Sequence, residues 1–142
     1  MSNLLRLALA LILGLVAGSG VNMALITLGP ALIAPPPGAD MTSANGLKAS
    51  MHLLEPRHFI MPFLAHALGT LLGALAGSLV AMSHRSIVAY TIGAAFLCGG
   101  IAASIMIPAP TWFKVLDLVA AYLPMAWLGL SIANGLKPVT AT

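Results

Sequence analysis

The sequence predicts an all-α integral membrane protein, a four-helix transmembrane bundle with a short interfacial helix between its first two spans. Hydrophobic residues make up 60% of the 142-residue chain, and the mean hydropathy is +1.03. The chain has only six Lys/Arg and three Asp/Glu residues, whereas about a quarter of the residues in an ordinary soluble domain are charged. Uncharged runs cover residues 7–39, 58–84, 86–113 and 118–136. Each run is long enough, or nearly so, for the ~20 residues of one membrane crossing.

These runs predict four spans in a single transmembrane domain that comprises residues 1–142. The spans are expected at about residues 4–28, 57–82, 87–107 and 113–133. Gly29-Pro30 predicts the end of the first span, because proline disfavours helix continuation. Pro56 suits the first helical turn of the second span. Pro124 lies inside the fourth span.

A long connection separates the first two spans. Pro35-Pro36-Pro37-Gly38 predicts an extended segment, and Asp40 is a candidate N-cap for a short helix within residues 42–54. Four apolar residues of that segment share one helical face, namely Ala44, Leu47, Met51 and Leu54. We expect the helix to lie at the membrane interface or to fold back against the bundle.

The basic residues are single and scattered, which excludes a nucleic-acid-binding patch. They lie near expected span ends, at Arg6, Lys48, Arg57, Arg85, Lys114 and Lys137. Under the positive-inside rule, the two sides of the membrane carry equal numbers of Lys and Arg residues. The long connection carries no Lys/Arg excess, so we place it outside and predict that both termini are cytoplasmic.

Small residues at four-residue spacing mark helix-packing faces in the first two spans. They are Ala10, Gly14 and Gly18 in the first span, and Gly69, Gly73 and Gly77 in the second. Such faces let helix backbones approach closely. We expect the two faces to meet in the first hairpin or at a homo-oligomer contact, with a structural role.

His66 is the leading candidate for a functional residue. An ionisable group deep in a span marks a functional site by default, and His66 shares a helix face with Gly69 and Gly73. Asn22 continues the glycine face of the first span, so we expect Asn22 and His66 to face each other. A hydrogen bond that holds the helices together is the alternative role.

Asp117 is the only acidic residue inside a predicted span. A buried carboxylate must be paired or neutralised, either by Lys114 three residues earlier or by turning inward toward His66. Tyr122 lies at a depth comparable to that of His66. On a continuous helix it stands about 140° around from Asp117, so we do not expect both in one cavity.

His52, Glu55 and His58 form an H-x2-E-x2-H pattern, whose residue types suit a metal. Pro56 disfavours helical geometry at Glu55, so a continuous helix cannot present all three. We therefore predict no cofactor and keep a metal only as a minor alternative. Together with Asp40, these residues gather on the long-loop side, where we expect any site to open.

Two proline motifs resemble those of a group of small four-span bacterial inner-membrane proteins of uncharacterised activity. The motifs are Pro-Pro-Pro-Gly-x-Asp at 35–40 and Ile-Pro-x-Pro-x-Trp-Phe at 107–113, with a glycine-rich span between them. The resemblance implies a multi-pass protein of the bacterial inner membrane. It implies no activity.

Three functions stay open at this point. The first is binding or transport of a small solute or ion in a polar cavity, in a homo-oligomer within the lipid bilayer. The second is an accessory subunit that docks on a membrane-protein partner and has no solute site. The third is a metal-binding protein or enzyme that uses the loop-side His/Glu cluster. We expect a non-enzymatic protein, since no nucleophile–base or phosphate-loop motif occurs in the sequence.

Overall fold

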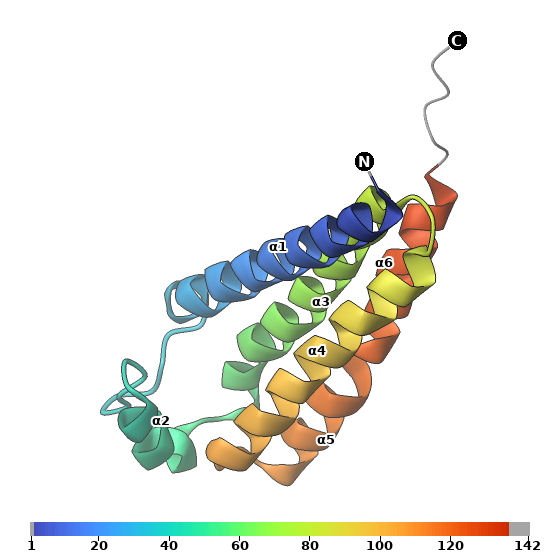
Figure 1. Cartoon of the computed structure of the whole chain (residues 1–142). Coiled ribbons are helices and arrows are strands. Elements are labelled where there is room, and N and C mark those ends of the chain that lie inside the picture. The colour runs from blue at the N-terminus through green and yellow to red at the C-terminus, as the bar shows by residue number, and fades with distance from the viewer. Residues whose placement is uncertain (1, 137–142) are drawn as a thin grey trace.

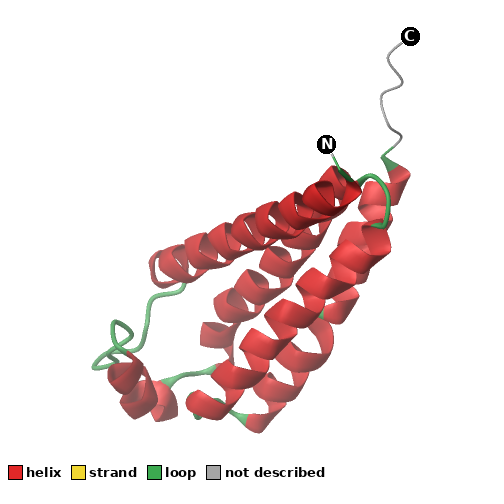
Figure 2. Ribbon diagram, in the orientation of Figure 1, coloured by secondary structure: helices red, strands yellow, loops and turns green. Residues whose placement is uncertain are grey.

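The computed structural model describes residues 2–136 and is all-helical over that range (Figure 2). The helices are α1 (Asn3–Leu32), α2 (Ala44–Ser50), α3 (Ile60–Ala81), α4 (Arg85–Met106), α5 (Thr111–Ala120) and α6 (Leu123–Gly135), with 3-10 turns η1 (Met51–Leu53) and η2 (Pro56–Phe59). Between residues 2 and 136, four segments are long and apolar enough to cross a membrane: Asn3–Leu32, Pro56–Ala81, Arg85–Met106 and Thr111–Gly135. The all-α class is thus confirmed, and a multi-pass membrane protein is consistent with these segments.

The four long segments run up and down in sequence. The start of α1 and the end of α6 lie at one end of the bundle, while α2 and the connection between α4 and α5 lie at the other (Figure 1). We call this second end the loop side. α3 packs against α1, α4, α5 and α6, so it is the central helix.

The two predicted glycine faces meet in the first hairpin, between α1 and α3. A Cβ atom added to Gly73 would lie 2.8 Å from the carbonyl oxygen of Gly14, and one added to Gly18 would lie 2.6 Å from that of Gly69. These neighbours are backbone atoms, so they cannot move aside as a flexible side chain would. Glycine therefore allows a backbone contact that any larger residue would push apart.

The rest of the core is built mainly from small side chains. Val88 and Ile92 of α4 are fully buried against Ala10 and Ala81. On the other face of α3, a second cluster of Ala74, Ala89, Ala126 and Leu130 joins α4 and α6. Many large apolar side chains stay exposed, as lipid-facing residues of spanning helices would be.

Two features of the first connection differ from prediction. α1 continues through Pro30 to Leu32. Pro30 removes only one backbone hydrogen bond close to the helix end, and the Ile33 N–H still bonds the Gly29 carbonyl at 2.8 Å. The short helix is capped by Ser43, whose hydroxyl accepts from the Gly46 N–H at 2.9 Å. The predicted cap, Asp40, instead lies upstream of the helix start.

The fourth span is not one helix but two. α5 ends at Ala120 and α6 begins at Leu123, with Tyr122 in a non-helical conformation (φ −117°, ψ −83°). Pro124 explains the break, because it lacks the N–H that would bond the Ala120 carbonyl. In the first turn of a new helix, a proline is well tolerated. The break redirects every side chain that follows it.

Replacing Gly73 by alanine should destabilise the protein, because the new Cβ would meet the α1 backbone. We expect the free energy of unfolding to fall by about 1–3 kcal/mol, measured by thermal unfolding in detergent. Gly20→Ala is the matched control, since nothing lies within 4 Å of a Cβ at Gly20. Equal stability of both variants would contradict the backbone contact.

Candidate functional site

A cavity of about 260 Å³ lies at the loop side, between α1 and α4. α1 and α4 diverge toward that end of the bundle (Figure 1). Closer to the termini, the space between them is filled by Ile92 and Phe96, which contact the glycine face of α1. The cavity walls are lined by Ile26, Gly29 and Pro30 of α1, by Gly100, Ala103 and Ser104 of α4, and by Ile33 and Ile107, which directly follow these two helices. We refer to it as the loop-side cavity.

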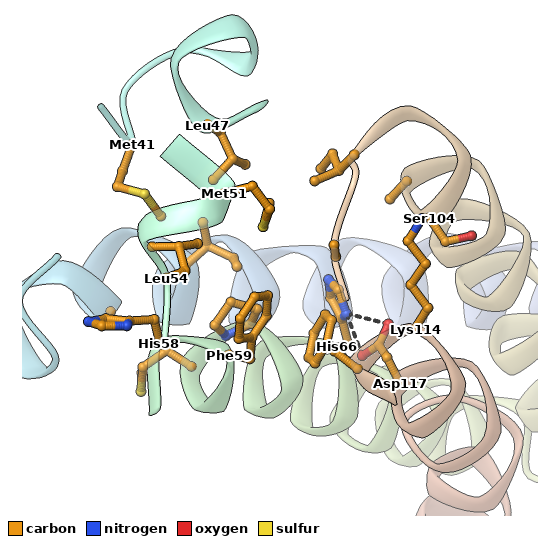
Figure 3. Close-up of a pocket in the computed structure, with 18 of the residues that line it drawn as sticks. Met41, Leu47, Met51, Leu54, His58, Phe59, His66, Ser104, Lys114 and Asp117 are labelled. Atoms are coloured by element: carbon orange, nitrogen blue, oxygen red, sulfur yellow. Dashed lines mark hydrogen bonds and ion pairs between the residues drawn. The ribbon is translucent and has the colours of Figure 1, made fainter. Parts of the chain in front are cut away.

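The connection between α1 and α3, residues 33–59, covers this cavity. We call this connection the covering segment. Met41, Leu47, Met51 and Leu54 line it from that segment (Figure 3). Leu47, Met51 and Leu54 are three of the four residues that the sequence places on one helical face, so this face turns toward the bundle. The segment thus supplies apolar side chains to the space that α1 and α4 leave open.

Asp40 stabilises this covering segment through hydrogen bonds to its neighbours in the chain. Its carboxylate accepts hydrogen bonds from the backbone N–H of Thr42 (2.8 Å), the hydroxyl of Thr42 (2.6 Å) and the hydroxyl of Ser43 (3.1 Å). The hydrogen bond from the Thr42 hydroxyl is the main reason that the pKa of Asp40 lies below its usual range. The carboxylate therefore supports the segment at neutral pH, and its contribution is lost as the pH falls through this lowered pKa.

The polar end of the cavity includes His66 of α3 and Asp117 of α5, and Asp117 also contacts Tyr122, a buried residue in the break between α5 and α6 that does not itself line the cavity. His66 of α3 places Nδ1 at 2.8 Å and 3.0 Å from the two carboxylate oxygens of Asp117 on α5 (Figure 3). The Tyr122 hydroxyl donates to Asp117 Oδ2 at 2.9 Å. The rings of His66 and Tyr122 also stack, with centroids 5.8 Å apart. We call these three residues the polar cluster.

The Tyr122–Asp117 hydrogen bond corrects the expectation that these two side chains point apart, although Tyr122 is not among the residues that line the cavity. That prediction assumed one continuous helix, and the break before Leu123 rotates Tyr122 toward Asp117. Gly100 of α4 makes room for the tyrosine, because a Cβ there would collide with the Tyr122 hydroxyl. The sequence offered no local signal for the role of Gly100, which depends on a contact between distant helices.

The hydrogen bonds of Asp117 determine the tautomer of His66. The Asp117 side chain is only 7% exposed, and a buried carboxylate needs donors. It accepts from the Tyr122 hydroxyl and from His66 Nδ1–H, so Nδ1 carries the proton of neutral His66. Nε2 then points away from Asp117 into the space beneath the covering segment (Figure 3). In this state Nε2 is an acceptor, and after protonation it is a donor.

Asn22 does not pair with His66 as expected, and of the two partners left open for Asp117 the structure has His66 rather than Lys114. Within residues 2–136, no ion pair joins Lys114 to Asp117; Lys114 lines the cavity instead. Asn22 packs its Cβ against Gly69, at 3.1 Å from the position of an added Cβ, and no hydrogen bond joins it to His66 in the described chain. Asp117, not Asn22, is the partner of His66.

His52, Glu55 and His58 do not converge. Glu55 pairs with Arg57 at 3.0 Å, and His52 is exposed. His58 is buried and acts as a local cap, because its Nδ1 accepts the Glu55 N–H at 2.9 Å. That hydrogen bond places the proton of the neutral ring on Nε2, a buried atom for which the described residues provide no hydrogen-bond partner. Over residues 2–136, no group of three or more His, Cys, Asp or Glu side chains could hold a metal ion.

Replacing Tyr122 by phenylalanine should destabilise the polar cluster, because buried Asp117 would lose one donor. We expect the free energy of unfolding to fall by about 1–2 kcal/mol, measured by thermal unfolding in detergent. Tyr90→Phe provides the control, since Tyr90 is 41% exposed and surface changes of this kind usually stay within about 0.5 kcal/mol. If Tyr122→Phe were as stable as the parent, Asp117 would not depend on the hydroxyl.

The resemblance of the two proline motifs to bacterial four-span proteins stays a prediction. The covering segment carries the first motif, and the α4–α5 connection carries the second, so both motifs lie at the loop side. No protein-family model, curated protein or solved structure matches the chain at a significant level.

Proposed function

We propose that the protein binds a small amphiphilic molecule within the membrane, in the loop-side cavity, with the polar group of that molecule against His66. The observation that supports this most directly is a largely apolar cavity in which His66, Asp117 and Lys114 lie together at one end, apart from His58. Small-molecule sites in proteins have this composition, in which apolar walls provide affinity and a few polar groups fix the orientation.

The walls suit an apolar chain rather than a hydrated ion. Three methionines line the cavity, Met41, Met51 and Met61, and methionine side chains adapt to ligands of irregular shape. The cavity volume of about 260 Å³ lies just below the ~300–1,000 Å³ typical of sites for drug-sized ligands. A single short apolar chain with a compact polar group is therefore the favoured occupant.

The polar cluster favours recognition over covalent chemistry. Asp117 orients His66 as the acid of a catalytic triad orients its histidine. However, the hydroxyl of Ser104, which also lines the cavity, donates to the Ile101 carbonyl at 2.7 Å. Ser104 is thus not positioned as a nucleophile activated by His66, so we favour a binding role for His66 Nε2.

Transport of the bound molecule and the accessory role both stay predictions. Transport would need a second state, because the glycine contact between α1 and α3 closes the bundle on the terminal side of the cavity. An accessory subunit would co-purify with a membrane-protein partner and bind no solute. Bacterial inner-membrane location and a homo-oligomer likewise remain expectations.

Filling the cavity should abolish binding. We expect Ala103→Phe to weaken binding of a short-chain amphiphile at least tenfold in nanodiscs, measured by calorimetry, because Ala103 lines the cavity wall. Ala102→Phe is the matched control: Ala102 is the adjacent residue, is exposed, and is not part of the lining. Equal binding by both variants would rule out the cavity as the site.

A further inference from the structure

We propose that the ligand of the loop-side cavity carries one acidic group on a single apolar chain, and that Lys114 and His66 Nε2 hold this group. The inference rests on the proposed function and specifies its substrate class. It follows from the charges that line the cavity and from the partners that each charged group already has.

Lys114 has no acidic side chain left to neutralise it. The chain contains three acidic residues, and each one is engaged elsewhere. Asp40 accepts from Thr42 and Ser43, Glu55 pairs with Arg57, and Asp117 accepts from His66 and Tyr122. Lys114 is half-buried and lines the cavity, so its ammonium group is available for an anion that comes with the ligand.

His66 lies at the same end of the cavity as Lys114. Lys114 and Asp117 both belong to α5, three residues apart, and Figure 3 shows Lys114 and His66 on the same side of the cavity, away from His58. Asp117 contacts His66 through Nδ1. A proton gained at Nε2 would therefore produce an imidazolium that already lies beside a carboxylate. Protonated His66 would thus be neutralised by Asp117.

The protons and charges of the bound state balance. A ligand that enters as a neutral acid transfers its proton to His66 Nε2 and becomes an anion, while Nδ1–H stays on Asp117. A ligand that enters as an anion takes this position after Nε2 has gained a proton from water. When the ligand carries one negative charge, as a carboxylate or a singly ionised phosphate monoester does, the ligand and Asp117 together carry two negative charges, opposed by His66 and Lys114. His58, the remaining titratable residue of the lining, uses Nδ1 as a local acceptor.

The acidic group has two possible chemical sources. A carboxylate would come from a fatty acid, and a phosphate monoester from a single-chain lipid. A diacyl lipid is much too large for a cavity of about 260 Å³. Both sources share the feature that the site recognises, one acidic group at the end of one apolar chain.

Calorimetry in nanodiscs, with protein-free nanodiscs as the blank, tests the proposal with three probes of equal chain length: decanol, decanoate and decyl phosphate. We expect at least one anion to bind about tenfold more tightly than decanol, a difference of ~1.4 kcal/mol. Lys114→Gln should remove this preference, so that in this variant the anion binds no more tightly than decanol. The tighter anion identifies the source of the acidic group.

Lys48→Gln is the matched control, because Lys48 is exposed on α2 and does not line the cavity. It should retain the preference for the anion. Binding of decanol as tight as that of both anions would overturn the acidic ligand, and a preference that persists in Lys114→Gln would overturn Lys114 as the group that holds the anion. Both outcomes leave the proposed amphiphile site standing. No binding of any probe above the blank would overturn both.

Discussion

The backbone contact between α1 and α3 is the constraint on which the other features depend. Gly14 and Gly18 lie so close to Gly69 and Gly73 that a Cβ on any of them would meet backbone or buried side-chain atoms. Between helices surrounded by lipid, such close packing replaces the hydrophobic effect as the source of stability. It fixes α1 against α3 along the hairpin. The divergence of α1 from α4 at the loop side then leaves a space, which the covering segment encloses.

The polar cluster follows from a second constraint, the high cost of an unpartnered carboxylate in an apolar environment. The fourth span carries its acid, Asp117, on a short helix that ends soon after it. The break lets Tyr122 turn back to Asp117, while α3 supplies His66 from across the bundle. Satisfying Asp117 therefore fixes the His66 tautomer and leaves one ring nitrogen directed into the cavity. The histidine that satisfies Asp117 is thus the residue to which we assign recognition of the ligand.

Much of the site could be anticipated residue by residue, but its partnerships only in part. His66 and Asp117 stand out because ionisable residues are rare in spans, and the glycine faces stand out by their spacing. The sequence left Asp117 a choice between Lys114 and His66, and the structure has His66; the expected pair of Asn22 with His66 does not form. The Asn22–His66 and Lys114–Asp117 pairs were inferred from depth or helical spacing alone, which do not say how far each helix is rotated about its axis.

The sequence by itself determined the all-α class, the four apolar segments and the helix faces, because these depend on composition and on spacing within one helix. The tertiary structure alone decided the Tyr122–Asp117 hydrogen bond, the space for Tyr122 at Gly100 and the cavity between α1 and α4. These features depend on the break before Leu123 and on the relative rotation of distant helices. Such rotation is set by the packing of whole faces, and no local pattern encodes it.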